Sequence, residues 1–160
     1  MKKLEKLTLK ELGYKMPLIS GMDQREIIGG GIDDNDCFFE ALVCVGSWLG
    51  YNNQSYESWT SCYGLTYGYM ELLHAVTEGV NSTVALDFLN QNFNSASYVD
   101  INNVSASGSG VTMGFLSSGS ATHAVLIMSV DDESVTYYDP QQNAEYSSPI
   151  SAFAGAFNIN

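Results

Sequence analysis

The chain has 160 residues and a net charge of −12, with 18 acidic residues against six Lys and Arg. A charge this negative argues against nucleic acid or an anionic membrane as a partner. The length suits one domain with a core of its own, with or without an appendage. No apolar run approaches the roughly 20 residues that cross a bilayer, so no membrane insertion is expected.

The charge changes sharply near residue 30. All six Lys and Arg lie at or before Arg25, and four of the 18 acids precede Gly31, so residues 1–30 carry +2 and the remainder −14. Such a shift marks a processing or domain boundary. We therefore expect a leader at 1–30 and one folded domain at 31–160.

The end of this first segment carries a motif. Gly29 and Gly30 follow a basic, loosely amphipathic stretch, with Ile27 four residues from the cut and apolar Met22 and Ile19 upstream. The segment resembles the double-glycine leaders of bacterial peptides that peptidase-containing ABC exporters recognise and cut. Glycine suits a narrow peptidase cleft because it has no side chain. The resemblance implies a cytoplasmic precursor and a domain secreted after leader removal; the alternative is a helix with a glycine cap.

Cys37 stands where polar residues run into a helical pattern. Asn35 or Asp36 can cap a helix there. Apolar residues then recur at helical spacing: Phe38, Leu42, Val45 and Leu49. At a helix N-terminus the dipole and the free N–H groups favour a thiolate, and the polar surroundings argue against an inert buried thiol.

The other elements are expected in the order helices first, strands second. The expected helices are 37–49 ended by Gly50, a second from about 62 to 76 weakened by Gly64 and Gly68, and a third over 84–89 capped by Asn81-Ser82. Residues 51–59 and most of 92–110 read as loops.

The expected strands are a short one at 98–101, then 111–116, 123–130 and 134–138, with a further strand or short helix within 146–157. The acidic turn 131–133 joins two of them as a hairpin. This is an α+β pattern, with N-terminal helices packed on a C-terminal antiparallel sheet.

His123 opens one expected strand and Asp139 ends the next. The turn lies about eight residues after the histidine and about seven before the aspartate, so the two are expected side by side across the hairpin. A carboxylate in that place holds an imidazole in one tautomer. The helix that begins with Cys37 would pack on this sheet and bring its sulfur to His123.

The remaining cysteines and histidine have simpler interpretations. Cys44 fits a small buried hydrophobe, and Cys62 is either a buried thiol or its disulfide partner. The cysteine spacing predicts no metal site. His74 fits a structural role; as an alternative base it has only Glu71 or Glu78, on its own helix, to orient it.

This set resembles the papain-like cysteine peptidases, nearest the compact bacteriocin-processing peptidase domain of ABC exporters. The matching segments are Asp36-Cys37 before a helix, His123-Ala124-Val125 opening a strand, and Asp139-Pro140 after the next strand. The resemblance covers about residues 31–157. It implies the papain-like fold and peptide-bond hydrolysis, with Cys37 as nucleophile, His123 as base and Asp139 as its orienting residue. A peptide or protein is the implied substrate, and no metal or other cofactor is needed.

One position departs from that pattern. The family has a glutamine six residues before the nucleophile that helps to form the oxyanion hole, and here this position is Gly31. Such a donor contributes about 3 kcal/mol to the transition state. Residues 34–42 also resemble the nucleophile motif of ovarian-tumour-type deubiquitinases, which implies donors from the loop at Asp34 and Asn35 beside the Cys37 N–H.

Three functions stay open on these residues. The first is a secreted bacterial cysteine peptidase. The second is an exported toxin, bacteriocin-like protein or binding protein on an inactive papain-like fold, which the Gly31 departure favours. The third is a glutamine deamidase or acyl transferase with the same three residues. The leader ends seven residues before Cys37, at most about 25 Å away, so we also expect the precursor to be partly inhibited.

Overall fold

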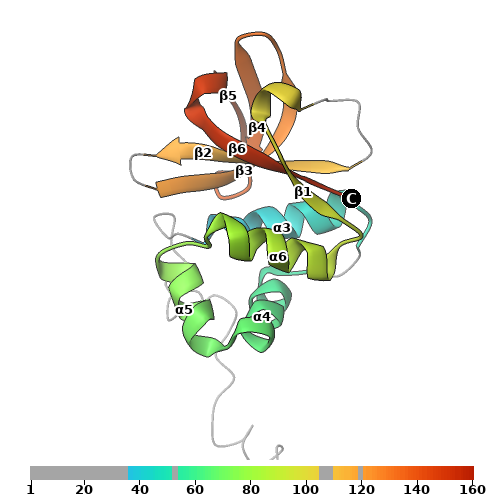
Figure 1. Cartoon of the computed structure of the whole chain (residues 1–160), viewed down its shortest axis with the longest axis vertical. Coiled ribbons are helices and arrows are strands. Elements are labelled where there is room, and N and C mark those ends of the chain that lie inside the picture. The colour runs from blue at the N-terminus through green and yellow to red at the C-terminus, as the bar shows by residue number, and fades with distance from the viewer. Residues whose placement is uncertain (1–35, 52–53, 105–109, 119–120) are drawn as a thin grey trace, which may run out of the picture.

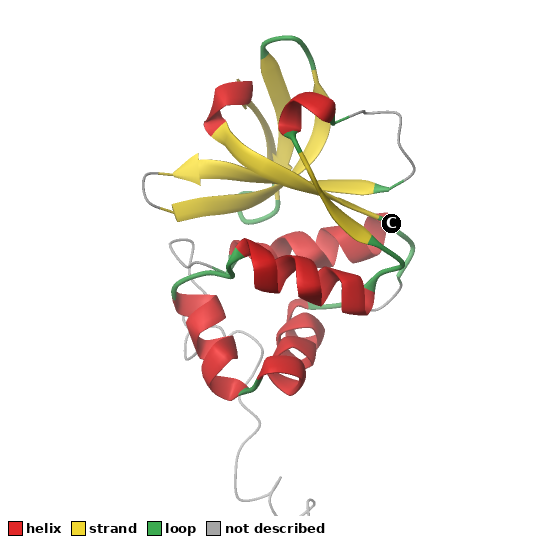
Figure 2. Ribbon diagram, in the orientation of Figure 1, coloured by secondary structure: helices red, strands yellow, loops and turns green. Residues whose placement is uncertain are grey.

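The computed structural model describes residues 36–51, 54–104, 110–118 and 121–160. Within these ranges four α-helices precede six strands, which form one antiparallel sheet. The expected α+β class, with helices packed on one face of the sheet, is therefore confirmed (Figure 1 and Figure 2). The leader, its cut at Gly29-Gly30 and the expected oxyanion residues Asp34 and Asn35 lie outside the described residues.

Two of the helices differ from the sequence expectation. The helices are α3 (Cys37–Trp48), α4 (Tyr56–Tyr67), α5 (Tyr69–Thr77) and α6 (Ser82–Asn92). The prediction of a loop over 51–59 is wrong at its end, because the Ser55 hydroxyl accepts the Ser58 N–H at 3.2 Å and starts α4 early. The single helix over 62–76 is also wrong. Gly68, with φ 97° and ψ 161°, separates α4 from α5 in a conformation that is essentially restricted to glycine.

The strands are β1 (Ala96–Val99), β2 (Val111–Ser118), β3 (Ala121–Val130), β4 (Ser134–Asp139), β5 (Ala144–Pro149) and β6 (Phe153–Ile159). Two 3₁₀ turns, η1 (Ile101–Asn103) and η2 (Ile150–Ala152), follow β1 and β5. The sheet order is β1-β6-β2-β3-β4-β5, with every neighbouring pair antiparallel. The expected strand at 98–101 begins two residues earlier, and 146–157 holds parts of two strands and a 3₁₀ turn.

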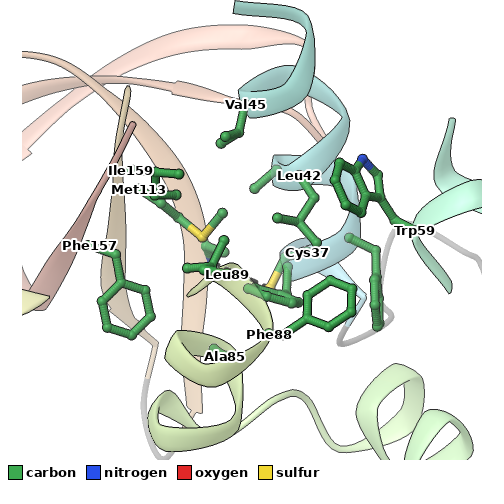
Figure 3. Packing of buried hydrophobic residues seen from close by; sticks show 14 of the residues in the cluster. Cys37, Leu42, Val45, Trp59, Ala85, Phe88, Leu89, Met113, Phe157 and Ile159 are labelled. Atoms are coloured by element: carbon green, nitrogen blue, oxygen red, sulfur yellow. Dashed lines mark hydrogen bonds between the residues drawn. The ribbon is translucent and has the colours of Figure 1, made fainter. Parts of the chain in front are cut away.

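The two faces of the sheet have separate apolar clusters. Along β3, Ala124 and Leu126 pack against the helices, whereas Val125 and Ile127 lie in a second cluster with η1 and η2. This alternation is the period of two that a strand imposes. Figure 3 shows the first cluster, where residues of α3 and α6 meet residues of β2 and β6: Leu42, Val45, Phe88, Leu89, Met113, Phe157 and Ile159.

The helical layer has an aromatic interior that fixes α3. Helices α3 and α6 lie next to the sheet, and α4 and α5 lie beyond them (Figure 1). The rings of Phe39 and Tyr63 meet at 5.3 Å, and those of Tyr63 and Phe88 at 5.2 Å. Offset and edge-to-face ring contacts at such distances stabilise by about 0.5–1.5 kcal/mol each. The first residue of α3 is thereby held against the start of β3.

Candidate active site

Cys37 is the first residue of α3, as the sequence predicts, but it is buried. Only 8% of its surface is exposed, because the first turn of α3 lies against β3 and the Ala124 N–H donates to the Cys37 Sγ at 3.3 Å. The expectation that its polar neighbours keep it from burial is therefore wrong. Asp36 takes the N-cap position, yet its side chain accepts no hydrogen bond from the helix N–H groups.

His123 lies between the other two predicted residues. Its Nε2 is 2.9 Å from the Asp139 Oδ2. The hydrogen bond with the Cys37 side chain is the largest cause that raises the pKa of His123 to about 9. The carboxylate of Asp139 raises it further, and burial acts in the opposite direction. The structure thus brings Cys37, His123 and Asp139 together.

The pairing of His123 with Asp139 is diagonal. Leu126 lies opposite Tyr138, so continuing this register sets Asp139 opposite Val125, two residues from His123. The expectation of a direct pair is wrong because the hairpin closes at the pair of Val130 and Val135, which is further along the chain from His123 than from Asp139. The register shift between Ile127 and Ser129 moves the residue opposite Asp139 from Leu126 to Val125, nearer to His123. Side chains two positions apart on neighbouring strands share a face, which keeps the carboxylate within reach of the ring.

The second oxygen of Asp139 organises the turn after β4. Asp139 Oδ1 accepts the backbone N–H groups of Gln141 at 3.0 Å and Gln142 at 3.3 Å. The Gln141 side chain then donates from Nε2 to the Asp36 Oδ1 at 2.7 Å. This contact joins the end of β4 to the start of α3. Sequence reasoning missed Gln141, whose only signal was its place two residues after Asp139.

A cleft of about 330 Å³ opens at Cys37. Its walls come from the start of α3, from β2 and β3, and from the junction between α5 and α6: Cys37, Phe38, His74, Glu78, Gly79, Val80, Asn81, Phe115, Thr122 and Ala124. A nucleophile at the wall of a cleft is the usual arrangement for a hydrolase site.

His74 lines this cleft and is exposed, so it is not a packing residue of the core. Its Nε2 lies 3.2 Å from the Glu78 Oε2, one of the two carboxylates considered for it. Because the imidazole that interacts with Cys37 is that of His123, the structure favours His123 over His74 as the base.

The other two thiols have different surroundings. All three cysteines are free, so Cys44 and Cys62 are not paired with each other. The Cys62 Sγ donates to the Asn92 Oδ1 at 3.3 Å. Burial, and then the charge of Glu40, raise the pKa of Cys44. Neither contact would activate a nucleophile.

Within the described ranges no group of three or more His, Cys, Asp and Glu side chains is placed to hold a metal ion. In the same part of the chain, no helix has both the length and the apolar character needed to cross a membrane.

Neither a family model nor a curated protein matches this chain. The candidate site therefore stands on its own geometry.

Proposed function

We propose that residues 31–160 are a papain-like cysteine peptidase that hydrolyses peptide bonds through Cys37, His123 and Asp139. The observation that carries the proposal is that His123 lies 2.9 Å from the Asp139 carboxylate and interacts with the Cys37 side chain, which raises the pKa of the imidazole. The Ala124 N–H beside Sγ supports it further, because an N–H donor stabilises a sulfur with negative charge.

The proposed reaction is acyl transfer through a thioester. The Cys37 thiolate attacks the carbonyl carbon, and the His123 imidazolium gives its proton to the nitrogen of the leaving amine. Water then attacks the thioester while His123 takes one of its protons, and the acid product leaves as the thiolate re-forms. Asp139 holds the ring in place throughout.

The start of α3 offers one donor for the oxyanion. The first N–H groups of a helix have no acceptor within it, and the Asp36 side chain does not accept from them. The Cys37 N–H is thus suited to the developing charge, in place of the glutamine that Gly31 replaces. Asp34 and Asn35 remain our proposal for further donors.

We also propose that residues 1–30 address the precursor to a peptidase-containing ABC exporter, which cuts after Gly30 and releases the domain outside the cell. The double glycine and the loss of every basic residue beyond Arg25 support this route. Its test is whether such an exporter peptidase cuts the chain there and fails on Gly30→Val.

The activity is tested by thiol labelling and by peptide cleavage. Residues 31–160 are treated with iodoacetamide at neutral pH, and mass spectrometry follows each cysteine. We expect Cys37 to react about tenfold faster than Cys62 in the same molecule, because a paired imidazolium maintains the thiolate. His123→Ala should remove this advantage.

The same protein is then given a peptide library, with Cys37→Ser as the matched control. Cleaved products that are absent with Cys37→Ser support a peptidase. Release of ammonia from glutamine without chain cleavage would instead identify the activity as that of a deamidase. If Cys37 is labelled no faster than Cys62 and all peptides stay intact, the proposal is contradicted and a binding protein is favoured.

A further inference from the structure

The cleft at Cys37 has an acidic residue, Glu78, in its lining at the junction between α5 and α6. Among the described residues that line the cleft, His74 and Glu78 are the two with ionisable side chains apart from the cysteine. The Glu78 side chain is 69% exposed, so it is open to a ligand and is not used to pack the fold. Its Oε2 lies 3.2 Å from the His74 Nε2.

The sign of the field in the cleft follows from the neighbouring groups. The C-terminus of α5 and the N-terminus of α6 meet there, so their opposite dipole ends offset each other. The buried carboxylates of Asp36 and Asp139 are bound to Gln141 and His123. No Lys or Arg follows Arg25, so no permanently charged cation of residues 31–160 neutralises Glu78.

Part of the cleft lining is apolar, beside the polar side chains of Asn81 and Thr122. Phe38, Val80 and Phe115 line it together with Glu78. An apolar surface that leads to a carboxylate matches a long side chain with an aliphatic stem and a cationic end. An acidic side chain would meet repulsion there, and a purely aliphatic one would gain nothing from the charge.

We infer that the cleft beside Cys37 accepts a lysine or arginine side chain of the substrate, and that Glu78 is the residue that selects it. The inference rests on the proposed function, since it names the substrate class of that same site. It assigns to Glu78 a role in specificity and none in the chemical step.

The first test measures the charge of the cleft without any turnover. Cys37 is modified by a trimethylammonium-bearing and by a sulfonate-bearing methanethiosulfonate. In each case the thiolate forms a disulfide with the reagent and methanesulfinate leaves. The rates are compared in wild type, in Glu78→Gln and in the matched control Glu133→Gln, which loses the same charge at the β3–β4 turn. About 10 mM salt is used, where the screening length is about 30 Å.

We expect the ratio of cationic to anionic rates to fall about fivefold in Glu78→Gln and to invert in Glu78→Lys. It should stay unchanged in Glu133→Gln. The unfolding midpoints of all variants are measured alongside, to show that the comparison is between folded proteins. Equal ratios in wild type and Glu78→Gln would overturn the inference.

The second test measures selection directly. Peptides that differ only by Lys, norleucine or Glu at positions flanking the cut are compared by kcat/KM. Lys should lead norleucine about fivefold in wild type, and the two should be equal in Glu78→Gln. Cleavage without any such preference overturns the inference and leaves the peptidase intact. A Glu78-dependent labelling ratio with no cleavage of any peptide removes the peptidase and leaves a cation-accepting cleft.

Discussion

At the scale of single residues, the two oxygens of Asp139 have separate tasks. Oδ2 holds the His123 ring, and Oδ1 accepts the N–H groups of Gln141 and Gln142. An asparagine at this position can still accept the N–H groups of Gln141 and Gln142 through its amide oxygen. It no longer offers the His123 ring a carboxylate. The effect on the reaction and the effect on the fold are therefore separable by substitution.

We predict that Asp139→Asn lowers kcat/KM about a hundredfold or more, because the imidazole loses its anionic partner. It should lower the unfolding free energy only through the lowered pKa of His123. Asp139→Ala should lose a similar amount of activity and also about 1–3 kcal/mol of stability, since the turn loses its acceptor. Peptide cleavage and urea unfolding measure the two effects. Asp139→Asn with wild-type kcat/KM would contradict the assigned role.

The raised pKa of His123 predicts a pH dependence of stability. An unfolded histidine titrates near 6.5 and this one near 9, so its contribution is complete below about pH 6.5 and is lost as the pH rises through about 9. We expect the urea midpoint to fall over this window in wild type. His123→Gln should remove this loss.

A second variant tests the cause. Because the Cys37 side chain contributes most to the raised pKa, Cys37→Ser should show a smaller loss of stability over the same window. We expect the urea midpoint to fall most steeply with pH in wild type, less steeply in Cys37→Ser and least in His123→Gln. A wild-type slope in His123→Gln would assign the titration to another group.

At the scale of elements, the contact between Gln141 and Asp36 holds the end of β4 to the start of α3. Asp36 is only 5% exposed, so its carboxylate needs a donor on this side. A pair of polar side chains thus holds β4, which carries Asp139, beside the start of α3, which carries Cys37. This contact acts in addition to the apolar core.

We predict that Gln141→Glu lowers the Cys37 labelling rate and kcat/KM about tenfold or more, because it sets a second carboxylate against a buried one. Gln141→Met keeps the length of the side chain without the charge and should do less damage. Equal losses in the two variants would mean that the missing hydrogen bond to Asp36, and not the added carboxylate, disturbs the start of α3.

Some of the helices and strands could be predicted from local sequence patterns alone. The start of α3 and the β3–β4 hairpin were predictable because the onset of helical apolar spacing and a tight turn are local signals. This is why Cys37, His123 and Asp139 were found. The break at Gly68 was not, because a glycine in a helical pattern can be tolerated or can end the helix, and only packing decides.

Other parts of the site depend on contacts between distant segments. Glu78 reaches the cleft because the α5–α6 junction packs beside Cys37, and no local pattern encodes that approach. Strand β6 lies between β1 and β2 although it is the last strand in sequence, so its place inside the sheet follows from topology and not from its own residues. Gln141 was missed for the same reason.

At the scale of the whole molecule, the charge of the domain gives a route to test leader inhibition. The last basic residue is Arg25, so trypsin removes most of the leader and leaves 26–160 uncut. We predict that trypsin treatment of the full chain raises both Cys37 labelling and peptide cleavage, because a basic leader that is within reach of an acidic cleft has been removed. Mass spectrometry identifies the product.

Protein that begins at residue 31 is the control, since trypsin has no site in it and should change nothing. Equal activity before and after trimming of the full chain would show that the leader acts as an address and not as an inhibitor.

The nucleophile and the groups around it come from separate layers. Cys37 belongs to the helical layer, whereas Ala124, 87 residues further along the chain, and His123 belong to the sheet. A chain whose layers have formed but not yet docked would show normal helix and strand content and still carry an ordinary, unreactive thiol. Under the proposed function, peptidase activity would arise only at the final stage of folding, so a chain exported in an unfolded state would stay inactive until it folded outside the cell.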